Sequence, residues 1–234
     1  MEKRALCVSL GAGRPEEITL RALRALQGAD IIYVPTTGHG RSRAKNCLEQ
    51  LGLALDRVRE VNIPMETDRC KAHGAYSALA DEMAQHCAQG QQLAITTVGD
   101  AGIYSTVQRV ASELSKRTVA LEYVSGVPSF VAAAARCGVA LVSGDETLVV
   151  HAHVEGVEAL SAELAHGDTV VLMKLSRYAE LLPALIAREQ ARSDFYYVEN
   201  LGVRGEELLL TSPAEILAHQ VPYFSLLIIK PKGE

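Results

Sequence analysis

The stretch AITTVGDAGIYSTVQRVASEL, residues 94–114, passes from a short apolar run through Gly-Asp-Ala-Gly into a segment with helical spacing. Between Val107 and Leu114, apolar residues recur at i, i+3, i+4 and i+7, which is the buried stripe of an amphipathic helix. Strand, loop and helix follow one another in this way several times along the chain, as in α/β proteins. The stretch raises the question of why a buried strand ends in Gly99 and Asp100 just before a helix.

The composition indicates a packed protein with room for two domains. The chain has 234 residues, of which 48% are hydrophobic and 22% are charged, as is typical of globular proteins. A chain of this length divides comfortably into two domains of about 100 to 120 residues each. We expect them at residues 1–124 and 125–234, with Gly126 and Pro128 at the joint.

Net charge, hydropathy and cysteine content indicate which binding partners and which cellular compartment to expect. The net charge of -5 gives no indication of binding to nucleic acid or to an anionic membrane. The opening MEKRALCVSLGAG differs from a signal peptide, and no span reaches the ~20 apolar residues of a transmembrane helix. The cysteines are scattered, odd in number and without a CxxC pair, which argues against a disulfide scaffold and favours the cytoplasm. They are Cys7, Cys47, Cys70, Cys87 and Cys137.

The expected elements differ between the two halves. Strands and helices alternate in the first half, which predicts a mainly parallel sheet, whereas the second half has fewer crossovers and predicts a mixed sheet. The predicted strands are residues 5–10, 30–35, 58–64, 92–98, 119–124, 147–152, 168–173, 194–199, 206–211 and 223–230. The predicted helices are residues 15–28, 42–52 with Ser42 as N-cap, 68–90, a segment after Asp100, an alanine-rich segment after Pro128, and residues 155–165 and 177–190.

Three loops of the first half follow strands and precede helices: SLGAGRPEE at 9–17, TVGDAGIYST at 97–106 and VSGVPSF at 124–130. Ligands of open α/β sheets bind beyond the carboxyl ends of the strands, so these loops are the expected site. Gly11 and Gly13 form an incomplete GxGxxG, and no Walker lysine follows. Nucleotide binding of those two types is therefore not expected, and the glycines alone are equally consistent with a tight turn.

Asp100 has two interpretations. A carboxylate at a helix start can cap backbone N–H groups. Alternatively, it can hold a ligand amine or ribose hydroxyl, since Gly99 and Gly102 allow close approach of the backbone and Ile103 and Tyr104 add apolar surface. Ser129 likewise suits either a helix cap or a ligand donor.

Histidines and basic residues offer further candidates. His151 and His153 form an HxH on a predicted strand, which would place both rings on one face. Zinc would require another ligand, and none is visible nearby, so we expect no metal site. Basic side chains in two loops suit either solvated surface or the binding of a polycarboxylate. They are His39, Arg41, Arg43, Lys45, Lys174 and Arg177, with Arg14 and Arg204 elsewhere.

An ordered set of motifs covers nearly the whole chain and resembles the tetrapyrrole methyltransferases, the class III S-adenosylmethionine enzymes. Other stretches are most similar to the members that methylate carbon 20 of precorrin-2 or cobalt-factor II. The family motifs are SLGAGRPEEITLRAL, DIIYVP, TVGDAGIYSTV, VSGVPSFVAAAA, DTVVLMK, YYVENLG and YFSLLII. The stretches similar to the carbon-20 enzymes are YVPTTGHGRSRA, GVPSFVAAAARCGVALVSGDETL and PYFSLLIIKP.

The resemblance implies a homodimer of subunits with two α/β domains, in which S-adenosylmethionine binds in the cleft between the domains and the tetrapyrrole lies in a trough of the first. S-adenosylhomocysteine would be the second product. The implied cofactor contacts are Leu10, Val98, Gly99, Asp100, Ile103, Pro128, Ser129, Met173 and Leu201. Gly11 and Gly13 would line the trough, and the candidates for carboxylate recognition are Arg14, Arg41, Arg43 and Lys174.

The chain departs from the family pattern at two of these loops. Residues 9–16 read SLGAGRPE where the family has GxGPGDPE, so Arg14 reverses a charge in the implied trough. Ala101 replaces the proline of the family's Gly-Asp-Pro.

The implied reaction is methyl transfer to carbon 20, followed by loss of a proton to Tyr104, His39 or His151. Alternatives are a sister methyltransferase acting on another ring carbon, a methyltransferase of the diphthamide branch that modifies a protein, and a non-catalytic corrinoid carrier. A metal chelatase that uses His151 and His153 is a further, chemically distinct alternative.

Overall fold

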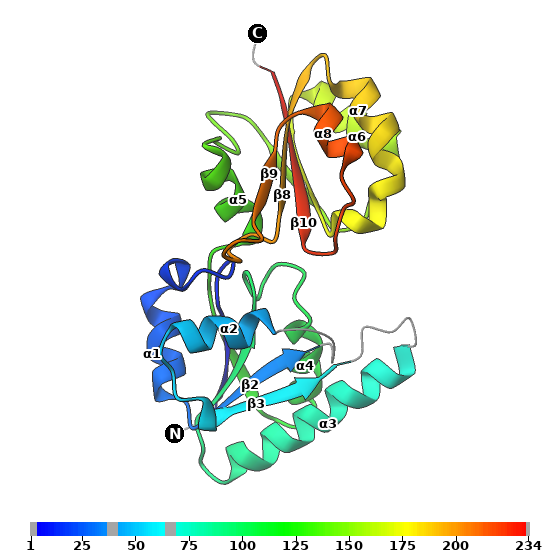
Figure 1. Ribbon diagram of the computed structural model, residues 1–234. Coiled ribbons are helices and arrows are strands. Elements are labelled where there is room, and N and C mark those ends of the chain that lie inside the picture. Colours follow the sequence, from blue (N-terminus) through cyan, green and yellow to red (C-terminus); the bar gives the residue numbers. More distant parts are fainter. Residues whose placement is uncertain (1–3, 37–41, 64–68, 233–234) are drawn as a thin grey trace. The chain divides into compact units, whose positions relative to one another are not determined.

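The computed structural model describes residues 4–36, 42–63 and 69–232 (Figure 1). The chain divides into two compact units, residues 1–128 and 129–234. None of the described helices is long and apolar enough to pass through a lipid bilayer.

The first unit is built on a five-stranded sheet with the order β3-β2-β4-β1-β5. Every neighbouring pair is parallel, so all five carboxyl ends lie along one edge, which confirms the predicted parallel sheet. The strands are β1 (Arg4–Ser9), β2 (Ile31–Thr36), β3 (Val58–Asn62), β4 (Leu93–Thr97) and β5 (Ala120–Val124).

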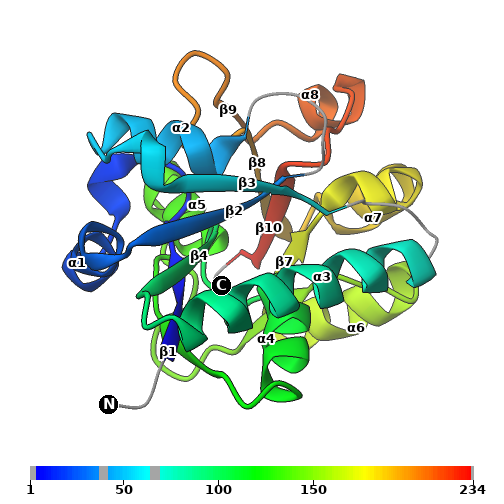
Figure 2. The same cartoon turned by 90° about the horizontal axis from the view of Figure 1, so that it is seen from below.

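Helices cover both faces of this sheet. Figure 2 shows α1 and α2 on one face and α3 and α4 on the other, and an apolar core fills each side. Such two-sided cover explains the nearly continuous apolar runs of the central strands. The helices are α1 (Leu20–Gly28), α2 (Arg43–Gln50), α3 (Arg69–Ala88) and α4 (Val107–Ser115), with short 3-10 turns at η1 (Pro15–Glu17) and η2 (Leu55–Arg57).

Two helix predictions in the first unit need correction. The helix predicted at 15–28 is interrupted, because Ile18 and Thr19 are extended and the Thr19 hydroxyl accepts the Ala22 N–H to cap α1. The helix expected directly after Asp100 begins only at Val107. Ser42, by contrast, is confirmed as the N-cap of α2, since its hydroxyl accepts the Lys45 N–H at 3.3 Å.

The second unit has a mixed five-stranded sheet with the order β6-β7-β10-β8-β9, as predicted. Only the β6–β7 pair is parallel. Figure 1 shows α5 on one face and α6, α7 and α8 on the other. The strands are β6 (Leu148–His151), β7 (Thr169–Met173), β8 (Ser193–Glu199), β9 (Leu208–Leu210) and β10 (Ser225–Pro231); the helices are α5 (Ser129–Cys137), α6 (Val157–His166), η3 (Leu175–Leu181), α7 (Leu182–Glu189) and α8 (Pro213–Ala218).

One edge of this second sheet collects the ends of three strands. Met173, the last residue of β7, pairs with Leu226 near the start of β10. Glu199, the last residue of β8, pairs with Ser225 on the other side of β10. The segments that follow β7 and β8 therefore leave the sheet at the same edge as the segment that enters β10.

Candidate functional site

The loops that follow β1 and β4 are joined by a reciprocal backbone contact. The Gly99 N–H donates to the Gly11 carbonyl at 2.6 Å, and the Gly11 N–H donates to the Gly99 carbonyl at 3.2 Å. Gly11 has φ +70°, and a Cβ there would lie 2.9 Å from the Glu17 carbonyl oxygen. A glycine is therefore required at position 11 on two separate grounds, backbone angle and space.

Asp100 connects this pair of loops to the loop after β5. One carboxylate oxygen accepts the Gly126 N–H at 2.8 Å, and the other accepts the Gly102 N–H at 2.7 Å. The carboxylate thus satisfies backbone donors, as one interpretation of Asp100 predicts, but those donors belong to loops and not to α4. Each oxygen of an ionised carboxylate can accept more than one hydrogen bond, so Asp100 retains capacity for a ligand donor.

Ser9 and Gly126 complete the junction, although no sequence motif marks either as a site residue. The buried Ser9 hydroxyl accepts the Ala101 N–H at 2.9 Å. A Cβ on Gly126 would lie 2.6 Å from the Ser9 Cβ and 2.9 Å from the Gly99 carbonyl oxygen. Both residues lie in the predicted site loops, 9–17 and 124–130, and their small size is the sequence feature that indicates them.

The predicted cofactor residues of the first unit lie in these loops. Leu10 and Gly99 are buried, whereas Val98, Asp100 and Ile103 are partly exposed. The structure brings Leu10, Gly99 and Asp100 to one junction, where the Leu10 N–H also donates to the Thr97 carbonyl at 2.8 Å.

Tyr104, a candidate proton acceptor, lies on the loop after β4 in a left-handed conformation. Its φ is +48°, which is strained for a residue with a Cβ, and 46% of its surface is exposed. The neighbouring Ser105 hydroxyl lies 2.9 Å from the Thr97 hydroxyl, which ties this loop back to the end of β4. Strained residues of this kind concentrate at functional sites.

Cys7 lies on β1, close to this junction. Burial, and to a lesser extent the charge of Asp100, raises the pKa of the Cys7 thiol to about 12. The thiol therefore stays protonated at neutral pH and is not a nucleophile.

In the second unit, Met173 ends β7, Lys174 follows it, and Leu201 comes two residues after the end of β8, all at the common edge of the sheet. Lys174 has φ +57° and Asn200 has φ +49°, so each of the two segments begins with a left-handed residue. Burial, followed by the charge of Arg177, lowers the pKa of Lys174. Leu201 is buried, and Ser129 is the first residue of α5.

The histidine pair does not have the predicted arrangement. β6 ends at His151, so His153 lies in a bend beyond the strand and the two rings do not share a strand face. The His151 Nε2 lies 2.8 Å from a carboxylate oxygen of Glu163. In the described part of the chain, no group of three or more His, Cys, Asp or Glu side chains is arranged to hold a metal ion.

The structure describes only some of the predicted basic residues. His39 and Arg41 lie outside the described residues, while Arg14 follows β1 and Arg43 begins α2. The Lys45 ammonium lies 2.5 Å from the Glu60 carboxylate, and this hydrogen bond raises its pKa. Lys45 is therefore paired within the protein.

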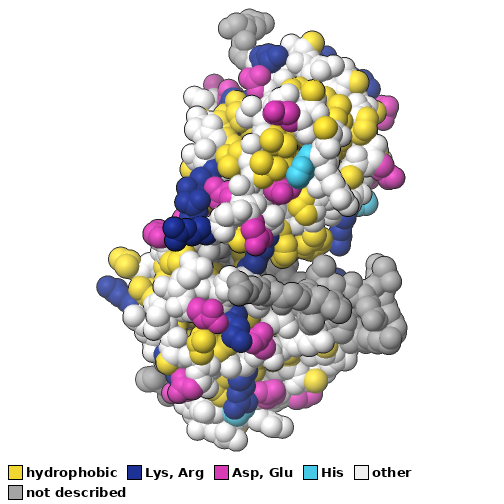
Figure 3. All heavy atoms as spheres, viewed as in Figure 1, with side chains coloured by type: hydrophobic (Ala, Val, Ile, Leu, Met, Phe, Trp, Pro, Cys, Tyr) yellow, Lys and Arg dark blue, Asp and Glu magenta, His cyan; other side chains and the backbone are white. Residues whose placement is uncertain are grey.

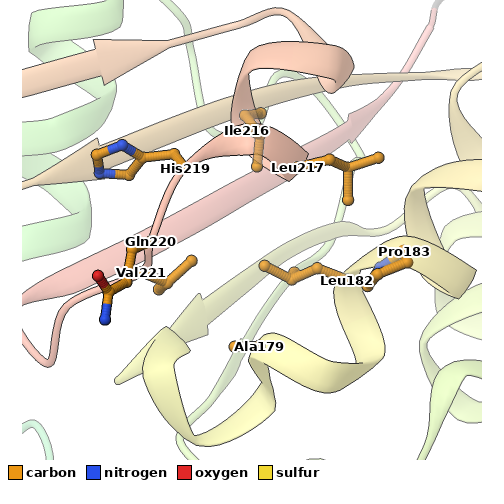
Figure 4. A pocket seen from close by; sticks show the side chains of 8 residues that line it. All are labelled: Ala179, Leu182, Pro183, Ile216, Leu217, His219, Gln220 and Val221. Carbon is orange, nitrogen blue, oxygen red and sulfur yellow. The ribbon is translucent and has the colours of Figure 1, made fainter.

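A cavity of about 330 Å³ lies in the second unit, and none of the predicted site residues lines it. Its lining is mainly apolar and comes from η3, α7, α8 and the segment after α8 (Figure 4). The lining residues are Ala179, Leu182, Pro183, Ile216, Leu217, His219, Gln220 and Val221.

Comparison with known proteins identifies what the chain is similar to. A family model described as tetrapyrrole (corrin/porphyrin) methylases matches residues 5–217. A cobalt-precorrin-2 C(20)-methyltransferase of Salmonella typhimurium is 27% identical, over 100% of this chain and 99% of the relative. A precorrin-2 C(20)-methyltransferase of a Sinorhizobium species is 26% identical, over 97% and 94%.

Other curated relatives are longer. A cobalamin biosynthesis protein CobIJ of Mycobacterium tuberculosis is 29% identical over 95% of this chain, which spans only 45% of that relative. The chain therefore spans about half the length of the first curated relatives it matches.

Solved structures share the fold. A cobalt precorrin-4 methyltransferase matches with a TM-score of 0.73 and 17% identity, covering 97% of this chain and 95% of that one. A uroporphyrin-III C-methyltransferase from Thermus thermophilus matches with a TM-score of 0.64 and 20% identity, covering 98% and 93%.

Proposed function

Because the chain belongs to the tetrapyrrole (corrin/porphyrin) methylase family, we propose that it methylates carbon 20 of precorrin-2 or cobalt-factor II in cobalamin biosynthesis. The observation that carries this proposal is similarity from end to end with proteins named as C(20)-methyltransferases. The methyl donor would be S-adenosylmethionine, and S-adenosylhomocysteine would be released.

The junction of the first unit fits such a donor. The Asp100 carboxylate can accept hydrogen bonds from a ribose hydroxyl or an amine, and its negative charge suits a positively charged sulfonium. Val98 and Ile103 are partly exposed and supply apolar surface beside it. We propose that Leu10, Gly99 and Pro128 of the first unit and Ser129, Met173 and Leu201 of the second are the other contacts.

S-adenosylmethionine supplies an electrophilic methyl group on sulfur, so the protein needs no nucleophile of its own. In the transfer, the bond from sulfur to the methyl carbon breaks as the bond to carbon 20 forms. The protein's task is alignment, which contributes up to ~7 to 11 kcal/mol in favourable cases. The proton lost from carbon 20 needs an acceptor, for which Tyr104, His39 and His151 are the candidates.

Recognition of the tetrapyrrole requires cations, because its side chains are carboxylates and the protein is acidic overall. We propose Arg14, Arg41, Arg43 and Lys174 for this role, with Gly11 and Gly13 lining the trough. A homodimer is proposed from the family resemblance, and a cytoplasmic location from the scattered cysteines.

The test is incubation of the purified protein with S-adenosylmethionine labelled with ¹³C in the methyl group, and with either precorrin-2 or cobalt-factor II. We expect one labelled methyl per product by mass spectrometry, with the NMR signal of a methyl at carbon 20. Comparison of the two substrates shows whether the natural one carries cobalt.

Each alternative has its own outcome in this experiment. Label at a different ring carbon indicates a sister methyltransferase, and label in neither corrinoid rejects the proposed step. Tight binding of S-adenosylmethionine without turnover indicates a corrinoid carrier. Replacement of His153 by alanine should leave most methyl transfer intact, whereas a chelatase that uses the histidine pair would lose its activity.

A further inference from the structure

The last residue of β8 carries a buried carboxylate with two side-chain donors. The Tyr197 hydroxyl donates to an oxygen of Glu199 at 2.5 Å, and the His219 Nε2 lies 2.7 Å from the same oxygen. The rings of Tyr197 and His219 pack edge to face with their centroids 5.7 Å apart. Three side chains from β8 and from the segment after α8 thus form one hydrogen-bonded group.

Burial keeps the Tyr197 hydroxyl of this group protonated. Tyr197 is fully buried and Glu199 is 8% exposed, so the carboxylate is stable there only while it is hydrogen-bonded. Burial first, and then the bond to Glu199, raises the pKa of Tyr197 well above its usual range, which keeps the phenol a donor. Because an ionised carboxylate only accepts, the hydrogen of the His219 contact is on Nε2.

The group lies next to the turn that carries Leu201. Asn200 follows Glu199 directly, has φ +49° and donates its N–H to the Phe224 carbonyl at 2.9 Å. Two hydrogen bonds therefore connect the end of β8 to the segment before β10, one from His219 to Glu199 and one from Asn200 to Phe224. Asparagine adopts the left-handed region more readily than other residues with a Cβ, and these two attachments hold it there.

The apolar cavity beside His219 does not explain the orientation of its imidazole ring. Figure 4 shows the His219 ring pointing away from the side chains of Leu182 and Val221. Figure 3 shows apolar side chains gathered over β9 and α8, where Leu209 and Leu217 are exposed. The imidazole thus points to Glu199. The residues that follow it, Gln220 and Val221, line the cavity.

We propose that Tyr197, Glu199 and His219 form a positioning triad that holds the turn at Asn200 and Leu201 in the shape that binds S-adenosylmethionine. His219 is the member that closes the triad from outside β8. The inference rests on the proposed function, in which Leu201 contacts the methyl donor. His219 is a positioning residue and not a catalytic one, because it acts through Glu199.

Three variants test the triad in the full-length protein. His219→Phe keeps a ring of similar size but has no donor, whereas the amide of His219→Gln can still donate to Glu199. The matched control is His166→Phe, since the His166 Nδ1 lies 3.0 Å from the Asp168 carboxylate at the opposite edge of the same sheet. Titration calorimetry measures the Kd of S-adenosylmethionine for each protein, and steady-state assays measure kcat and the KM for the donor.

We expect the Kd of His219→Phe to rise about tenfold, the effect of one lost hydrogen bond to a buried charged group. His219→Gln and His166→Phe should bind like the wild type. In His219→Phe the KM for the donor should rise while kcat at saturating donor changes little. Hydrogen exchange at the amides of Asn200 and Gly202 should become faster in this variant and should return to the wild-type rate in His219→Gln.

Equal affinity in all three variants would overturn the triad and leave the proposed function standing. The triad would also be overturned if His219→Gln bound S-adenosylmethionine as weakly as His219→Phe does. A His219→Phe variant with a lower kcat but an unchanged KM for the donor would overturn it as well. A wild-type protein that does not bind S-adenosylmethionine would reject the proposed function, and the triad with it. If His219→Phe does not fold, His219→Asn replaces it, because its shorter amide should not reach Glu199 and should bind the donor less tightly than His219→Gln.

Discussion

The Asp100 carboxylate lies 2.8 Å from the Gly126 backbone nitrogen, so one side chain holds together the loops that leave β4 and β5. Its second oxygen accepts the Gly102 N–H within its own loop. Hydrogen bonds to a charged group are stronger than neutral ones. The carboxylate therefore stabilises the junction even before any ligand binds.

Replacing Asp100 by Asn should weaken this junction. The Asn side chain has one acceptor oxygen, and its NH₂ group would face one of the two backbone donors. We expect the free energy of unfolding to fall by about 1 to 3 kcal/mol, measured by urea denaturation, together with weaker binding of S-adenosylmethionine.

Asp30→Asn is the matched control, since the Asp30 carboxylate accepts the Gln92 N–H at 2.7 Å before the start of β4. It is exposed, so the stability loss should be smaller and the affinity for the donor unchanged. Unchanged affinity in Asp100→Asn as well would contradict a role for Asp100 in binding.

Gly126→Ala should destabilise the first unit through steric overlap. The added methyl would lie 2.6 Å from the Ser9 Cβ and 2.9 Å from the Gly99 carbonyl oxygen, neither of which is the flexible end of a side chain. Overpacking of this kind costs typically about 1 to 3 kcal/mol. Gly28→Ala, where nothing lies within 4 Å, should leave stability unchanged or improved in the same thermal and urea measurements. Equal behaviour of the two variants would show that the junction tolerates expansion.

Lys174→Gly should separate stability from function. Lys174 and Thr118 have φ values of +57° and +56°, so glycine at either position removes a similar strain and should stabilise the fold by up to about 1 kcal/mol. Only Lys174→Gly should raise the KM for the tetrapyrrole, because Thr118 lies in the turn between α4 and β5. A variant at Lys174 with unchanged KM would remove this residue from the proposed substrate site.

Arg117→Leu should reduce the sensitivity of stability to acid. The hydrogen bond from Arg117 lowers the pKa of Asp81, and hydrogen bonds from Lys116 and then Arg117 lower the pKa of Glu113. A carboxyl whose pKa is lowered by folding stabilises the fold above its unfolded-state pKa, and this contribution disappears as the pH falls through the folded-state value.

The difference in unfolding free energy between pH 7 and the acid range, about pH 3, should therefore be larger in the wild type than in Arg117→Leu. Arg57→Leu is the control, because Arg57 donates to the carbonyls of Gln27 and Ala29, which do not titrate. Its stability should fall by the same amount at both pH values. If the unfolding free energy of the wild type and of Arg117→Leu changed equally with pH, Arg117 would not be what lowers the pKa of Asp81 and Glu113.

The strands of both sheets were predictable from the sequence because their signal is local. Apolar runs such as QLAITTV and DTVVLM end within two residues of β4 and β7. The missed elements depend on contacts that no periodicity shows. The break before α1 depends on Thr19, which caps the helix and also donates to the Ser125 carbonyl. α8 is too short to give a periodic signal.

The loops of the candidate site were predictable from the sequence, but the contacts among them were not. Strand-to-helix loops with glycine indicated the junction correctly, whereas the partners of Asp100 come from residues 2 and 26 positions away. The arrangement predicted for His151 and His153 was wrong because β6 ends at His151, two residues before His153. The Tyr197–Glu199–His219 group carries no sequence motif, since its third member is 20 positions from the second.

The two-way contact between Gly11 and Gly99 has an evolutionary consequence. Each loop supplies both the donor and the acceptor for the other, so an insertion or deletion in one would leave two buried polar groups unmatched unless the other changed in concert. Loop lengths at these two positions should therefore be inherited together, while the outer portions of both loops are free to diversify.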